Sequence, residues 1–175
     1  GSYLKASNTD AGDEFGTSVA ISGDRLVVGA QFEDGAAPGV DGDDSSNTRL
    51  SAGAAYIFGR DPATGAWSPE AYVKSSHPGG WDWFGYAVAI SGDTVVVGAP
   101  GEDSDATGVN GDAGNNSLDS SGAAFVYVRD PATGEWAQEA YLKASNTEFS
   151  ARFGNAVAID GDTIVVGAVM ATNPP

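Results

Sequence analysis

The stretch "FGTSVAISGDRLVVGA", residues 15–30, decides the fold because it occurs three times in the chain. Near-copies read "FGYAVAISGDTVVVGA" from Phe84 and "FGNAVAIDGDTIVVGA" from Phe153. Successive copies begin 69 residues apart. A fixed period of this kind indicates a repeat architecture in which each repeat is one supersecondary unit.

Each copy of the stretch predicts a β-hairpin. In "SVAISGD" small or polar residues alternate with Val19 and Ile21, which is the period of two typical of a strand, and "RLVVGA" is a short β-branched run. The intervening glycine tolerates the positive φ of a two-residue turn. Two more strand-like segments follow, "GAAYIFGRD" or "GAAFVYVRD" and then "WSPEAYVKSS" or "WAQEAYLKAS". Four strands per period without helical periodicity predict an all-β fold.

Four antiparallel strands in one repeat are the unit of a β-propeller blade. A stacked solenoid and a sandwich built from a duplicated domain are the alternatives. We expect residues 1–175 to form a single propeller segment of about two and a half blades. Its expected parts are the last strand of a preceding blade (1–14), two complete blades (15–83 and 84–152) and the first two strands of an incomplete blade (153–175).

The pairing of "FG" with a downstream "VVGAP" (residues 96–100), and the alternating strand between them, resembles the FG-GAP repeat. This repeat is the blade unit of the integrin α-subunit head. The order of "YLKASNT", "SVAISGD" and "GAAYIF" is similar to that of bacterial members. The resemblance covers nearly the whole chain. It implies a propeller, typically of seven blades, that serves adhesion or ligand binding at a bacterial surface or in a secreted protein.

Many blades of that family hold calcium in a D-x-D-x-D-G-x-x-D loop between the FG strand and the GAP strand. This chain has only a tight turn there, with one aspartate each at Asp24, Asp93 and Asp162. Calcium takes six to eight oxygen ligands, which one turn aspartate cannot supply. The calcium site of the family therefore does not carry over to these turns.

The long acidic loops that begin at Gln31 and Pro100 are the remaining metal candidates, and they align without a gap. Oxygen-bearing side chains separated by glycines suit a hard cation such as calcium. The alternative is an Ω-like loop that its own hydrogen bonds hold together. The candidate ligands are Glu33, Asp34, Asp41, Asp43, Glu102, Asp103, Asp105, Asn110 and Asp112.

The segment "HPGGWDWFG", residues 77–85, is specific to the second copy, because the other copies read "NTDAGDEFG" and "NTEFSARFG". Trp81, Asp82 and Trp83 predict a stacking platform for a sugar or an anchor for a protein ligand. The alternative is that the tryptophans pack against a neighbouring blade or subunit.

The composition restricts the function classes. Eight basic against 24 acidic side chains give a net charge of −16, which disfavours nucleic acid and anionic membranes as partners. No apolar run approaches the roughly 20 residues of a membrane-spanning helix. The chain has no cysteine, a single histidine and no G-x-S-x-G motif, so a nucleophile–base pair is not apparent. We expect a non-enzymatic binding, adhesion or structural module, with a carbohydrate-binding propeller as the alternative and a hydrolase as a weaker one.

About two and a half blades are fewer than the roughly four of known propellers. The end blades would expose apolar faces and unpaired strand edges. We therefore expect these ends to be covered in one of two ways. Other copies of the chain could join by strand completion into a ring or filament, or the remainder of a longer propeller could supply the missing strands.

Overall fold

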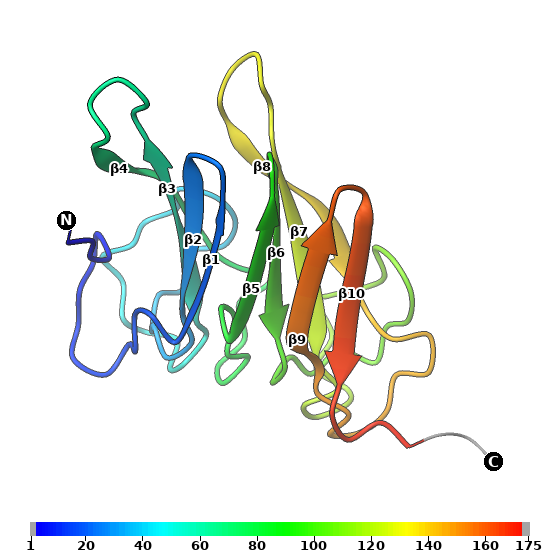
Figure 1. Ribbon diagram of the computed structural model, residues 1–175. Helices are drawn as coiled ribbons and strands as arrows, with labels where there is room; N and C mark the ends of the chain where they lie inside the picture. Colours follow the sequence, from blue (N-terminus) through cyan, green and yellow to red (C-terminus); the bar gives the residue numbers. More distant parts are fainter. Residues whose placement is uncertain (1–2, 173–175) are drawn as a thin grey trace.

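The computed structural model describes residues 3–172, and each repeat folds as one antiparallel sheet (Figure 1). The first sheet has the order β1 (Ser18–Ser22), β2 (Arg25–Ala30), β3 (Ala54–Arg60) and β4 (Trp67–Val73). The second has the order β5 (Ala87–Ser91), β6 (Thr94–Ala99), β7 (Ala123–Arg129) and β8 (Trp136–Leu142). A third pairs β9 (Phe153–Asp160) with β10 (Thr163–Ala168).

The prediction of an all-β fold built from four-stranded propeller blades is confirmed. Residues 3–172 contain no helix, and hence none that could span a membrane. The two four-stranded sheets fall within residues 15–83 and 84–152, and the third hairpin falls within 153–175. Residues 1–2 and 173–175 of the expected terminal segments lie outside the described residues.

The repeated stretch forms the predicted hairpin in every copy. In the first, Ser22 pairs with Arg25 across a two-residue turn in which Gly23 has a φ of 56°. Gly92 and Gly161 take the same conformation in the other two hairpins. Left-handed backbone at this turn position is the reason for a glycine there.

The glycines of the repeated stretch also allow neighbouring blades to approach closely. A Cβ atom on Gly29 would overlap the carbonyl oxygen of Gly85 in the next blade, and one on Gly85 would overlap the carbonyl oxygen of Ala54. The second and third blades repeat this contact between Gly98 and Gly154. The FG and GA glycines therefore meet across a blade boundary, which explains why both occur in every copy.

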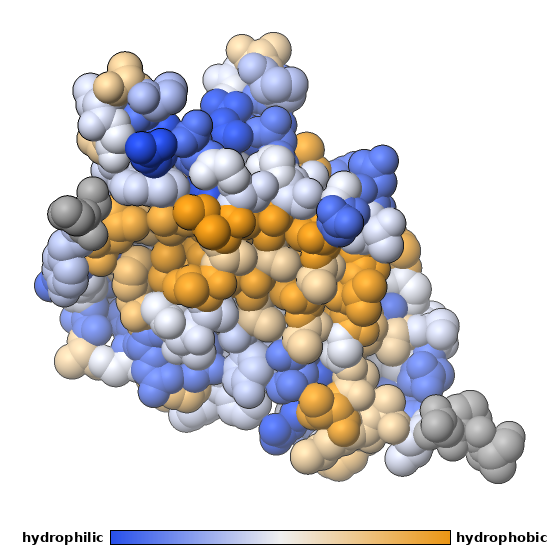
Figure 2. Space-filling model, in the orientation of Figure 1, coloured by the Kyte–Doolittle hydropathy of each residue, from blue (hydrophilic) through white to orange (hydrophobic). Residues whose placement is uncertain are grey.

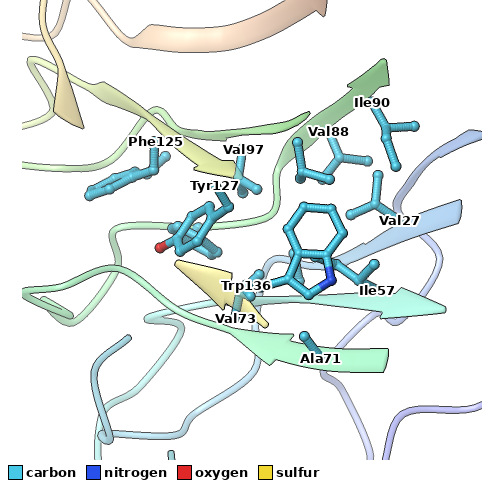
Figure 3. Close-up of a cluster of buried hydrophobic side chains, with 14 of the residues drawn as sticks. Val27, Ile57, Ala71, Val73, Val88, Ile90, Val97, Phe125, Tyr127 and Trp136 are labelled. Atoms are coloured by element: carbon cyan, nitrogen blue, oxygen red, sulfur yellow. The ribbon is translucent and has the colours of Figure 1, made fainter. Parts of the chain in front are cut away.

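The main hydrophobic core lies between the first and second sheets (Figure 3). Alternate residues of each strand point into it, as the period of two requires. The labelled core side chains come from both blades: Val27, Ile57, Ala71 and Val73 from the first, and Val88, Ile90, Val97, Phe125, Tyr127 and Trp136 from the second.

The N-terminal segment, expected at 1–14 as the last strand of a preceding blade, forms no strand in its described residues 3–14. A fourth strand hydrogen-bonds to the third strand of its own blade, as β4 does to β3. Among residues 3–172 no such partner is present for it. The segment instead packs against the first blade. Ala6 is buried in a second hydrophobic cluster with Tyr56 and Tyr72, and Leu4 packs against that cluster.

The outer faces of the first and third sheets are open. Val19 and Ile21 on β1 are 69% and 65% exposed, whereas their counterparts on β5, Val88 and Ile90, are 9% and 8% exposed because the first blade covers them. Val165 on β10 is exposed in the same way on the opposite side of the row. Figure 2 shows a hydrophobic band across the strands that face the viewer.

Candidate functional site

Each acidic loop begins with a carboxylate that is buried in an ion pair. Lys74 on the segment after β4 pairs with Glu33, and the Tyr72 hydroxyl donates to the Glu33 Oε1 atom over 2.9 Å. In the second blade, Lys143 Nζ lies 2.6 Å from Glu102 Oε2, and the hydroxyl of Tyr141 donates to Oε1 over 2.7 Å. The two glutamates that the sequence suggested as calcium ligands thus neutralise buried lysines.

Because these ion pairs are buried, they affect both the pKa of each lysine and the stability of the fold. Burial lowers the pKa of Lys74, and the adjacent Glu33 carboxylate opposes that shift. The same two causes act on the pKa of Lys143. Removing one partner of a buried ion pair typically costs about 3–5 kcal/mol of stability, because the other charge is left uncompensated. The glutamate–lysine pairs therefore fasten each acidic loop to the outer strand of its blade.

Asp34 and Asp103 have a second structural role in the same loops. Asp34 Oδ1 accepts a hydrogen bond of 2.7 Å from the Ser51 backbone N–H. Asp103 Oδ1 accepts one of 2.7 Å from the Ser120 backbone N–H. Each aspartate closes its loop by tying the beginning of the loop to its end.

Asp41 and Asn110 join the middle of each loop to the outer strand. Asp41 Oδ1 accepts from the Tyr72 N–H over 2.9 Å, and Asn110 Oδ1 accepts from the Tyr141 N–H over the same distance. Both residues have positive φ, 51° and 55°. Asparagine and aspartate adopt this left-handed conformation more readily than most side chains do. The conformation accounts for an aspartate in one copy and an asparagine in the other.

The remaining candidates lie at exposed positions of the loops. Asp43 Oδ1 accepts from the Ser45 N–H and hydroxyl, which lowers the pKa of Asp43, and Asp112 Oδ1 accepts from the Gly114 N–H. The Asp105 backbone N–H donates to Asn115 Oδ1.

The nine candidates do not gather at one place in the described part of the chain. Within residues 3–172, no three carboxylate or histidine side chains come together closely enough to hold a metal. The hydrogen bonds above favour the alternative of a self-bonded loop. Calcium binding itself stays a prediction.

The structure separates the three residues of the expected ligand platform. Trp81 is 58% exposed and lines a pocket of about 280 Å³ together with Phe32 and Leu50. Trp83 instead packs beneath the Arg152 guanidinium, whose central carbon lies 5.7 Å from the ring centroid. Only Trp81 could therefore stack on a ligand without displacing a neighbouring blade.

Asp82 points inward and is buried. Its Oδ2 atom accepts a hydrogen bond of 2.6 Å from the Gly79 N–H. Burial raises the pKa of Asp82 to about 7, and the nearby carboxylates of Glu102 and Asp103 contribute to the rise. Asp82 is thus a structural group of the turn rather than part of an exposed platform.

Sequence reasoning missed the basic partners of the loop glutamates. The signal was present as Tyr-x-Lys in "EAYVK" and "EAYLK". Because side chains two apart on an extended segment share a face, the tyrosine and lysine point to the same carboxylate.

Sequence reasoning also missed an ionic cluster between the first two blades. Arg25 Nε lies 3.0 Å from Glu70 Oε2, and Arg25 Nη1 lies 2.9 Å from Asp93 Oδ1. Arg129 Nε lies 3.1 Å from Glu70 Oε1. Threonine replaces Arg25 in the other copies, at Thr94 and Thr163, so this cluster is specific to one blade boundary.

The comparison with known families agrees with this repeat geometry. A family model described as the FG-GAP repeat matches residues 2–58, 67–127 and 136–174, which together make up most of the chain. No curated protein is similar enough to the chain to count as a match.

Proposed function

Since the chain belongs to the FG-GAP repeat family, we propose that it is a non-enzymatic binding or structural module of the cell surface or extracellular space. In this proposal, other copies of the chain cover the open faces of its first and third blades. A rigid row of blades presents loops to a ligand, which is the usual division of labour between framework and loops. Trp81 and its pocket are where we expect a protein or glycan ligand to bind.

The exposed apolar residues of the first blade carry the proposal. Val19 and Ile21 lie on β1, and Leu4, Leu26 and Val28 line the same apolar hollow of about 320 Å³. Contiguous apolar surface of this kind marks an interaction site in soluble proteins.

The third blade offers the complementary feature, an unpaired strand edge. In the described residues β10 pairs with β9 alone, whereas β2 and β6 each pair on both sides. A groove of about 480 Å³ lies beside this hairpin, between blades two and three, and its apolar lining includes Val126, Leu142, Ile159 and Ile164. An edge next to a groove that is partly lined by apolar side chains suits an added strand, whose main chain pairs while alternate side chains fill the groove.

Light scattering after size exclusion, at two protein concentrations, tests the proposal. We expect the wild type to have a mass above that of the monomer, rising with concentration. The double variant Val19→Asp/Ile21→Asp should be a monomer with an unchanged circular dichroism spectrum, because both side chains are already exposed. The control Leu50→Asp replaces an exposed leucine of the first acidic loop and should associate as the wild type does.

Two results contradict the proposal. A monomeric wild type at both concentrations would favour cover by further blades of a longer propeller. If the double variant associates as strongly as the wild type, the contact between copies does not involve these side chains of β1.

A further inference from the structure

A buried polar cluster connects the N-terminal segment to the first blade. The carboxylate of Glu33 contacts Lys74 through Oε2 and accepts a hydrogen bond of 2.9 Å from Asn8 Nδ2 through Oε1. The Tyr56 hydroxyl donates to Asn8 Oδ1 over 2.6 Å, and the Tyr72 hydroxyl donates to Glu33 Oε1. One carboxylate thus joins an amine to a side-chain amide.

We propose that this cluster is a self-reacting cross-link site, at which Lys74 Nζ and the Asn8 side chain form an isopeptide bond. Lys74 passes a proton to Glu33, and the neutral Nζ then forms a bond to Asn8 Cγ. Glu33 delivers that proton to Nδ2 and accepts a second one from Nζ. The Cγ–Nδ2 bond breaks, and the products are one new amide and one ammonia. No oxidant or cofactor takes part.

The hydrogen bonds of the cluster suit these steps. Tyr56 donates to the oxygen of Asn8 on which negative charge develops during the attack, so it would act as an oxyanion donor. Glu33 contacts both the attacking nitrogen and the leaving nitrogen, which is the position of a proton carrier.

Burial supports the neutral amine that the attack requires. Lys74 and Glu33 are fully buried, and Tyr56 and Tyr72 are nearly so. Burial lowers the pKa of Lys74, so a proton leaves the ammonium group more readily than it does in water. A dry site also keeps water from competing with the amine for the amide carbon.

For the reaction to occur, the side chain of Asn8 must move closer to Lys74 Nζ. Attack requires about 3–3.5 Å between the reacting atoms, and the two side chains now contact opposite oxygens of Glu33. Asn8 is half-buried and lies on a segment outside any strand. A shift of this segment, with β4 unchanged, would bring Cγ onto Nζ.

The second blade has the same ion pair without the amide. Lys143 pairs with Glu102 as Lys74 pairs with Glu33. The counterpart of Asn8, 69 residues later, is His77, which has no amide carbon for an amine to attack.

The hydroxyl that holds the amide is also missing there. The counterpart of Tyr56 is Phe125, and Lys143 Nζ donates to Ser121 Oγ over 2.7 Å. Amide and hydroxyl occur together in the first copy and not in the second, so the second blade serves as an internal control.

Intact-mass spectrometry of the purified, folded chain tests the proposal independently of its state of association. We expect a mass lower than that of the sequence by one ammonia, and the full sequence mass in Asn8→Ala. Trypsin should fail to cut after Lys74 while it still cuts after Lys143. The digest should contain a branched peptide that joins residues 6–25 to residues 61–129.

Two further variants separate this bond from other reactions of asparagine. Lys74→Arg should keep the full mass. Ammonia loss in that variant would overturn the proposal, because it would show that Asn8 forms a cyclic imide with its own backbone. Tyr56→Phe, which copies Phe125, should slow bond formation by about 100-fold. A folded wild type that keeps the full sequence mass after prolonged incubation would also overturn it.

Discussion

At the level of single residues, the buried carboxyl group of Asp82 makes stability depend on pH. Burial raises the pKa of Asp82 to about 7, whereas an unfolded aspartate titrates near 3.9. Between these values the folded chain holds a proton that the unfolded chain has released. The contribution of Asp82 is therefore complete below about pH 4 and is lost as the pH rises through about 7.

Asp82→Asn should remove this dependence, since the amide resembles the protonated acid and its oxygen can still accept from Gly79. At pH 8 we expect the free energy of unfolding to exceed that of the wild type by more than about 1.4 kcal/mol, the value of one pKa unit. Near pH 4 the two proteins should agree. Urea unfolding at both values measures the difference, with exposed Asp24→Asn as the control. An equal gain at both values would contradict a protonated Asp82.

The residue types of the two acidic loops predicted only in part what their carboxylates do. Glu33, Asp41 and their counterparts in the second copy align in sequence, but alignment does not reveal whether an oxygen faces a cation or a lysine. Lys74 is 41 residues from Glu33 in the chain, and only the folded blade brings the two together. The sequence therefore left a calcium site and a self-bonded loop as two open interpretations.

At the level of elements, the contact between FG and GA glycines predicts unequal effects of one substitution. Gly85→Ala would place a methyl group on the carbonyl oxygen of Ala54, and the backbone there cannot move away cheaply. Gly16→Ala is the matched control, because this glycine has a similar φ (102° against 89°) and, in the described part of the chain, no atom within 4 Å of an added Cβ.

Both variants lose stability because alanine disfavours positive φ, which costs about 1–2 kcal/mol. Gly85→Ala should lose at least about 1 kcal/mol more, the lower end of what overpacking costs. Urea denaturation of the two variants and the wild type gives the comparison. Equal losses would mean that blade contact does not explain why the motif recurs.

The strands were predictable where a partner follows in the same repeat. Alternation and a glycine turn suffice for β1–β2 and for its two later copies, since hairpin partners are adjacent in sequence. The segment Tyr3–Thr9 has the residues of a fourth strand and does not form one. Strand propensity is weak without a neighbour to bond to.

At the level of the whole molecule, charge and apolar surface oppose each other. The net charge of −16 repels copies of the chain from one another, whereas in the proposed association the open faces of the end blades would hold the copies together. Salt screens the repulsion over a Debye length that falls from about 30 Å at 0.01 M to about 8 Å at 0.15 M.

Association of the wild type should therefore strengthen as salt rises over this range. Sedimentation velocity at several salt concentrations measures it, and the variant Val19→Asp/Ile21→Asp should sediment as a monomer throughout. Dissociation on adding salt would instead show that ion pairs hold the copies together.

Gly16 is the FG glycine of the first blade and Gly167 is the GA glycine of the third blade, and in the described residues neither has a partner glycine across a blade boundary. Among residues 3–172, no atom lies within 4 Å of a Cβ built on Gly16, and the atoms nearest to one built on Gly167 belong to Ala156 of its own hairpin. Because the contact joins the FG glycine of one blade to the GA glycine of the blade before it, an open row always has one contact fewer than it has hairpins. If copies associate as proposed, joining the end of one row to the start of another would supply the missing contact without any new residue. Such a junction is head-to-tail, so the rotation from one copy to the next decides between a closed ring and an endless fibre.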